Sequence, residues 1–111
     1  MTTPDNPLYT RRQYQRYPCA LPVKVIADAD IFDGTAVNIG IGGMLIITDN
    51  SRPPIALETN LKLRFRLPSL PYDTEAECCV RWGNGNAIGV QFTGLEAKDV
   101  LGIRQFTDDW Q

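Results

Sequence analysis

Residues Leu61 to Leu67 read Leu-Lys-Leu-Arg-Phe-Arg-Leu, a strict alternation of four apolar and three basic side chains. Successive side chains of a β-strand point to opposite faces of the sheet. The stretch therefore predicts a strand that buries its leucines and phenylalanine and exposes its lysine and arginines.

A second strand pattern follows from Thr74 to Trp82. Glu75 and Glu77 fall on its polar face, where they can pair across a hairpin with the basic side chains of the first strand. Two neighbouring carboxylates could instead serve acid–base chemistry, but a solvated face opposite the arginines is the simpler interpretation. The other face of this strand comprises Thr74, Ala76, Cys78, Val80 and Trp82.

Alternating or β-branched apolar runs predict four further strands, at about 21–25, 31–38, 43–47 and 88–92. Pro22 suggests that the first of these lies at a sheet edge, because proline lacks the N–H of a ladder hydrogen bond. Gly83 to Asn86 supplies hairpin-turn chemistry, since asparagine and glycine tolerate positive φ.

The period of the pattern changes after Thr93. Thr93 and Glu96 have the spacing of a capping box, and apolar residues then recur at helical spacing as far as Trp110. One amphipathic helix is therefore expected to close the chain. Since a lone sheet would leave its edges open, the predicted fold class is all-β with one terminal helix: a six-stranded antiparallel β-barrel plugged by a C-terminal α-helix.

The chain has 111 residues and a mass of 12.4 kDa, enough for one domain with a modest core. Residues 1–10 hold two prolines among polar side chains and are expected to form a flexible lead-in to a single domain at 11–111. The N-terminus has no signal-peptide pattern, and no apolar run approaches the roughly 20 residues needed to span a bilayer. Three cysteines make no even disulfide framework, which favours a reducing cytoplasm.

Histidine is absent from the sequence, which removes the commonest general base and the commonest zinc ligand. We therefore expect a protein that is not an enzyme and that uses no metal or cofactor. The net charge of −2 argues against a nucleic-acid polymer as partner, because such binding needs a basic surface. The run from Arg11 to Ile26 is basic, whereas the C-terminal stretch is acidic, which suggests a small anionic ligand.

Asn38, Gly40 and Gly43 keep the spacing N-x-G-x-x-G between two apolar runs. With only small groups there, backbone N–H groups and the Asn38 amide could reach an anion directly. The alternative is that the glycines merely turn a corner of the sheet.

Arg12 and Arg16, with Arg11 beside them, precede the first predicted strand. A guanidinium fork forms bidentate bonds with phosphate oxygens or with the O6 and N7 edge of guanine, which lysine cannot do. Arginines in an unstructured arm can also be simply solvated, so this motif alone does not indicate a binding site. It does so only together with the other motifs of the chain.

Three motifs together, in this order and separation, resemble a PilZ domain: Arg11-Arg12-x-x-x-Arg16, Asn38-x-Gly40-x-x-Gly43, and Ala87-Ile88-Gly89-Val90-Gln91-Phe92 before a terminal helix. That family shows R-x-x-x-R, then an aspartate or asparagine, a serine two positions on and a glycine three further. The resemblance spans about Arg11 to the end of the chain. It implies a six-stranded antiparallel barrel that binds cyclic di-GMP, a bacterial second messenger.

By matching motif positions, the resemblance implies that Arg12 and Arg16 grip phosphates and guanine edges and that Asn38 bonds a guanine. Gly43 would allow close approach of the ligand. Gly40 stands where the family pattern has serine, so Gly40→Ser is predicted to add a hydrogen bond and tighten binding. Trp82 lies at a strand end, where its ring could stack on guanine or pack in the core.

The function implied is that of a cytoplasmic receptor, without a membrane span, in which cyclic di-GMP orders the arginine arm and so alters an effector protein that the sequence does not identify. The arm is expected to be mobile without ligand. The alternative is an interaction module of the same fold, for pilus or flagellar machinery, that does not bind the nucleotide. Gly40 and an acidic helix face near Asp99, Asp108 and Asp109 would favour that alternative.

Overall fold

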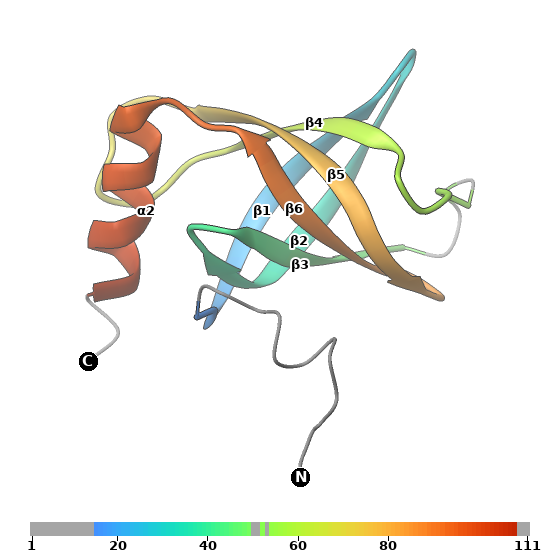
Figure 1. Ribbon diagram of the computed structural model, residues 1–111, viewed down its shortest axis with the longest axis horizontal. Helices are drawn as coiled ribbons and strands as arrows, with labels where there is room; N and C mark the ends of the chain where they lie inside the picture. Colours follow the sequence, from blue (N-terminus) through green and yellow to red (C-terminus); the bar gives the residue numbers. More distant parts are fainter. Residues whose placement is uncertain (1–14, 50–51, 53, 109–111) are drawn as a thin grey trace, which may run out of the picture.

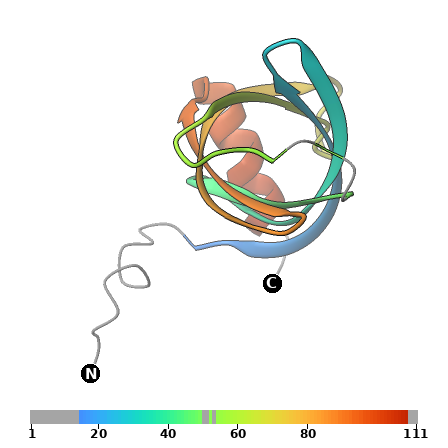
Figure 2. The ribbon, with the colours of Figure 1, turned by 90° about the vertical axis from the view of Figure 1, so that its right-hand side faces the viewer.

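The computed structural model describes residues 15–49, 52 and 54–108. Within these ranges the chain forms β1 (Tyr17–Ala27), β2 (Asp30–Gly40), β3 (Gly43–Thr48), β4 (Asn60–Phe65), β5 (Thr74–Asn84), β6 (Ala87–Gly94) and α2 (Ala97–Asp108). The strands pair antiparallel in the order β1-β2-β3-β6-β5-β4, and β4 returns to β1, so the sheet closes into a barrel (Figures 1 and 2). The predicted fold class is confirmed.

The barrel is filled by the side chains that the alternating pattern directs inward. In β4, Leu61, Leu63 and Phe65 are buried, whereas Lys62 between them is exposed. All six strands contribute to one buried cluster, and Ile103 of α2 belongs to it as well. The helix lies across one end of the barrel, behind the ring of strands in Figure 2.

The helix approaches the barrel closely at Gly102. A Cβ at this position would lie 2.7 Å from Leu70 Cδ1 and 3.4 Å from Leu67 Cδ1, both in the β4–β5 connection. The neighbouring Ile103 is fully buried, and replacing such a side chain by alanine costs about 2–5 kcal/mol. The helix is therefore part of the core.

The predicted capping box at Thr93 and Glu96 is wrong. β6 continues through Thr93 to Gly94, which pairs with Glu77 of β5, so Thr93 stays in the sheet. The helix begins at Ala97, and the Glu96 carbonyl accepts its first intrahelical bond from Val100 N at 3.1 Å. Glu96 thus holds the N-cap position, because sheet pairing extends the strand beyond the capping motif.

The strand that contains Pro22 is not at a sheet edge, because β1 pairs with β2 on one side and β4 on the other. Pro22 pairs with Thr35 of β2, and the pairing with β4 begins only at Val23. Pro22 therefore lies just beyond the ladder of the closing β1–β4 pair, which does not need a donor from this position.

Candidate functional site

The arginine arm, which precedes β1, is described only at Gln15 and Arg16, where it contacts the barrel. The Arg16 side chain is part-buried, and its Nη2 donates to the carbonyl oxygen of Val90 in β6 at 3.4 Å. Arg11 and Arg12 lie outside the described residues. The arm therefore enters the structure against the outside of the barrel, beside the β2–β3 turn.

Gly40 and Gly43 are cross-strand partners at the end of the β2–β3 hairpin, and both allow close backbone approach. A Cβ on Gly40 would overlap the carbonyl oxygen of Gln15, and one on Gly43 would overlap that of Val90. Neither glycine has a positive φ, a conformation that only Gly85 shows among the described glycines. Because neither glycine has a side chain, the arm can pack against Gly40 and strand β6 against Gly43. That Gly43 also allows close approach of the ligand stays a prediction.

Asn38 points outward from β2, between the buried Ala36 and Ile39. Its Oδ1 accepts a hydrogen bond from the backbone N–H of Leu45 at 3.2 Å. Within the described part of the chain, no acceptor is recorded for its side-chain NH₂ group. This orientation leaves two N–H donors directed away from the backbone, the group needed to bond an acceptor on a guanine edge.

Trp82 also faces outward, because a β-bulge interrupts the alternation of β5. Val80 pairs with Val90, but Trp82 pairs with Gly89, so Arg81 is the extra residue. A bulge of this kind redirects the side chains that follow it. Trp82 is 49% exposed, so the open choice between stacking platform and core residue is decided against the core.

Arg81 is a neighbour of this surface that the sequence did not single out. Its Nη1 donates to Glu58 Oε1 at 2.6 Å and its Nε to Gln91 Oε1 at 2.8 Å. Gln91 is the cross-strand partner of Gly43, so this guanidinium lies on the same side of the barrel as the glycine turn. Because arginine is common on the polar face of a strand, the sequence pattern did not single out Arg81. The bulge that brings it to this side of the barrel has no signal in the sequence.

The three cysteines carry no sign of a reactive site. All are free thiols, and burial raises the pKa of Cys78 from 9.0 to about 12, with a smaller contribution from the charge of Cys79. Burial also raises the pKa of Cys19. A thiol that keeps its proton is a poor nucleophile.

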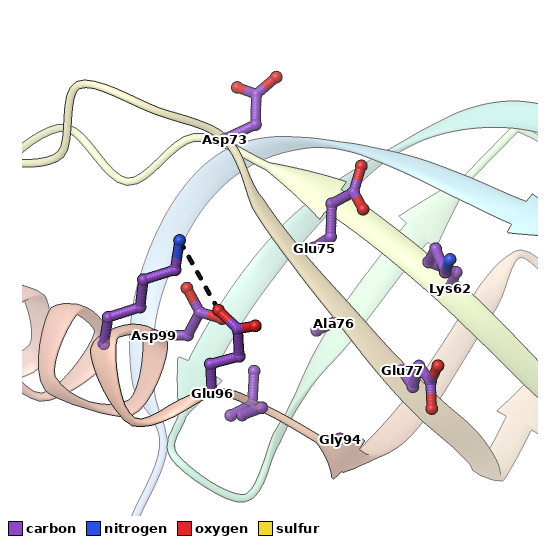
Figure 3. A pocket seen from close by; sticks show the side chains of 10 residues that line it. Lys62, Asp73, Glu75, Ala76, Glu77, Gly94, Glu96 and Asp99 are labelled. Atoms are coloured by element: carbon purple, nitrogen blue, oxygen red, sulfur yellow. Dashed lines mark ion pairs between the residues drawn. The ribbon is translucent and has the colours of Figure 1, made fainter.

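A groove of about 550 Å³ lies elsewhere, between the start of β5 and the beginning of α2, and includes none of these residues (Figure 3). In the described ranges, no group of three or more metal-ligating side chains comes together. No helix in them is both long and apolar enough to cross a membrane.

Among solved structures, the barrel is similar to MotI/DgrA, the inhibitor of motility of Bacillus subtilis, with a TM-score of 0.76 and 23% identity over 91% of this chain. The chain spans about half of that protein (51%). It is also similar to the PilZ domain of Escherichia coli YcgR, whose structure contains c-di-GMP, with a TM-score of 0.71 and 10% identity over 89% of this chain and 90% of that one.

A third similar structure is the PilZ domain of CeSA from a cellulose-synthesizing bacterium, with a TM-score of 0.68 and 13% identity over 86% of this chain and 97% of that one. No curated protein matches the sequence. The family model for the PilZ domain matches residues 10–109, nearly the whole chain. The chain therefore belongs to the PilZ domain family, a family of cyclic di-GMP receptors.

Proposed function

We propose that this chain is a cytoplasmic, non-enzymatic receptor for cyclic di-GMP that alters a partner protein when the ligand orders its arginine arm. The observation that carries the proposal is the position of Arg16, held at the Val90 carbonyl beside Gly43. One end of the R-x-x-x-R motif thus already lies beside the glycine turn of the N-x-G-x-x-G motif. Family membership supplies the ligand class.

The proposed roles follow from the chemistry of each side chain. Arg12 and Arg16, with Arg11 beside them, would bond the phosphates and the acceptor edge of guanine through their guanidinium forks. Asn38 would donate its free NH₂ hydrogens to a guanine acceptor, and the exposed ring of Trp82 would stack on a base. The hydrogen bond from Arg16 to Val90, long at 3.4 Å, would be exchanged for a stronger one to a charged oxygen.

Calorimetric titration with cyclic di-GMP tests the proposal. Saturation at micromolar concentration or below is expected for the parent protein. In the double variant Arg12→Ala/Arg16→Ala, two charged hydrogen-bonding groups worth about 1.5–3 kcal/mol each are lost, so binding should fall by more than about a hundredfold. Arg104→Ala removes an exposed arginine of α2 and serves as the control that should bind like the parent. A double variant that keeps the parent's affinity would contradict the proposal.

Ordering of the arm by the nucleotide can be measured separately from binding. Hydrogen exchange over Leu8 to Tyr17 should slow when the nucleotide is added, because an arm of low apolar content gains its order from the ligand. Most of that segment lies outside the described residues. Equal exchange with and without nucleotide would mean a preformed site and would remove ordering of the arm from the mechanism.

The alternative function, an interaction module that does not use the nucleotide, has one observation in its favour, the acidic groove at the start of β5. The acidic helix face expected around Asp99 and Asp108 is wrong, because Asp99 is buried whereas Asp108 is exposed; Asp109 is outside the described ranges. Asp99 instead lines the acidic groove at the start of β5. A titration that shows no saturation with cyclic di-GMP would favour this alternative.

A further inference from the structure

The groove of about 550 Å³ between β5 and α2 is strongly acidic (Figure 3). Its volume is within the range of sites that bind side chains and small ligands. Five of its ten lining residues are acids and two are lysines. The lining comprises Lys62, Asp73, Glu75, Ala76, Glu77, Gly94, Leu95, Glu96, Lys98 and Asp99.

Three of the acids already have cationic partners. Asp73 pairs with Arg66 at 2.9 Å and Glu75 with Arg64 at 3.0 Å, both exposed, and Glu96 lies 3.6 Å from Lys98 Nζ. Exposed pairs of this kind contribute little stability, so they shape the charge of the rim rather than hold the fold. Glu77 and Asp99 have no ion pair in the part of the chain that the structure describes.

Asp99 is the unusual member of this group. It is only 3% exposed, yet in the described ranges no hydrogen bond or ion pair of its carboxylate is recorded. It lies in the first turn of α2, where the helix dipole favours a negative charge but does not replace a direct partner. Asp99 is not among the fully enclosed orphan groups, so its carboxylate still meets the solvent of the groove, where a cation could become its direct partner.

The walls of the groove indicate which cation fits. Leu95 adds apolar surface beside the carboxylates, which suits the methylene stem of a long basic side chain. A guanidinium fork can bond two carboxylates at once, whereas an ammonium acts as a point charge. A metal ion is disfavoured because the described residues bring no three metal ligands together.

We propose that this groove receives an arginine side chain of a partner protein, with Asp99 as the carboxylate that accepts its guanidinium and Glu77 as a second acceptor. The groove does not share a residue with the proposed nucleotide site. Glu77 and Trp82 lie five residues apart along β5, about 17 Å at the usual rise per residue. The inference does not depend on nucleotide binding, and its test contains no nucleotide.

The probe for the test is a hexapeptide of alternating glycine and arginine, titrated into the isotopically labelled full chain and followed by NMR. We expect saturable shifts at the backbone amides of Gly94, Leu95 and Asp99. The same peptide with citrulline in place of arginine keeps the shape and hydrogen-bonding plane but carries no charge, and it should cause no such shifts. Shifts of equal size with citrulline, or scattered over the whole acidic surface, would overturn the proposal.

Two substitutions of equal charge give the matched comparison. Asp99→Asn should weaken peptide binding at least about tenfold, because a desolvated charge partner is lost. Asp108→Asn removes the same charge from the exposed last turn of the same helix and should bind like the parent. If both variants lose affinity equally, the groove acts only through the overall charge of the protein and the proposal fails.

Thermal melts accompany these titrations, and Asp99→Asn should melt close to the parent, because asparagine keeps the size and shape of the buried side chain. Should that variant fold poorly, Glu77→Gln, at an exposed residue, replaces it and should weaken the peptide in the same direction. Spermidine offers charge without a guanidinium fork. If it binds in the groove as tightly as the arginine peptide, the ligand is a small polyamine and the partner-protein inference is wrong.

Discussion

Asn38 of β2 and Trp82 of β5 lie on one row of cross-strand partners that runs around the outside of the barrel. Asn38 pairs with Leu45, Leu45 with Gly89, and Gly89 with Trp82. Three strand spacings separate the two ends of this row, about 14 Å. Gly89 lies directly beside Trp82 in this row, and a Cβ there would contact the tryptophan side chain, 3.4 Å from Trp82 Cβ. The row thus places a hydrogen-bonding amide and an aromatic ring on one surface.

Trp82→Ala should weaken cyclic di-GMP binding without affecting the fold. Stacking of a base on an aromatic side chain is worth about 1–3 kcal/mol, so calorimetry should show a loss of affinity of about 5- to 150-fold. The exposed ring contributes little to the core, and the melting temperature should change little. Ile31→Ala, which removes an exposed apolar side chain from β2, is the control. Parent-like affinity in Trp82→Ala would remove the ring from the site.

Gly40→Ser should loosen the arm in the free protein, an effect that opposes the hydrogen bond expected from the sequence; tighter nucleotide binding stays a prediction. The new Cβ would overlap the Gln15 carbonyl, and backbone cannot yield as a flexible side chain does. We expect faster hydrogen exchange at Gln15 and Arg16 and loss of the Arg16–Val90 contact. Gly83→Ala is the matched control, because its Cβ would meet only Ala87 O at 3.8 Å. Unchanged exchange in Gly40→Ser would show that the arm accommodates the serine.

Thr74→Val should stabilise the protein. The Thr74 hydroxyl is fully buried, and within the described residues it has no hydrogen-bond partner. An unsatisfied buried hydroxyl costs on the order of 1 kcal/mol or more, which valine removes at nearly the same shape. Urea unfolding should therefore show a gain of about 1 kcal/mol.

The control for Thr74→Val is Thr48→Val, which should destabilise. The Thr48 hydroxyl donates to the Asn86 carbonyl at 3.1 Å and accepts a bond from Arg52 Nε, so valine there removes two hydrogen bonds. If Thr74→Val loses stability as Thr48→Val does, the Thr74 hydroxyl has a partner after all.

Cys78 should make stability fall in alkali. Its pKa is about 12 in the folded protein, chiefly because of burial, against 9.0 for an ordinary thiol. The folded state therefore favours the protonated thiol, and this contribution is complete below pH 9 and shrinks as pH rises toward 12. Between pH 9 and 11, urea unfolding of the parent should lose up to about 1.4 kcal/mol more per pH unit than Cys78→Ala. Parallel curves for the two proteins would contradict this.

The sequence predicted the strands well wherever side chains alternate without interruption. Leu61 to Phe65 are buried and exposed in the expected order, and Arg64 pairs with Glu75 across the predicted hairpin. The alternation of apolar and polar residues determines which face of a strand is buried, because a register shift of one residue would move all of its apolar side chains to the solvent face. The closed six-stranded topology followed from the number of strands and the need to cover their edges.

The sequence failed where a single residue or a distant neighbour changes the outcome. The sequence left Trp82 open between a stacking ring and a core residue, because no composition signals the bulge at Arg81 that turns the side chain outward. Asp99 was expected on an exposed helix face and is buried, because the β4–β5 connection and the start of β5 close around the first turns of α2. Both outcomes depend on tertiary contacts, which local patterns do not contain.

Closure of the barrel also limits how a partner can recognise this protein. Every described strand has a hydrogen-bonded neighbour on both sides over part of its length, so a peptide could add as a further strand only at strand ends that are paired on one side. Recognition by backbone pairing is therefore confined to such strand ends, for example residues 30–33 of β2, and is excluded from the fully paired middle of the barrel wall. A partner at the middle of the wall must instead bind side chains, which makes its specificity sensitive to single surface substitutions and limits the edge-to-edge association that open sheets risk.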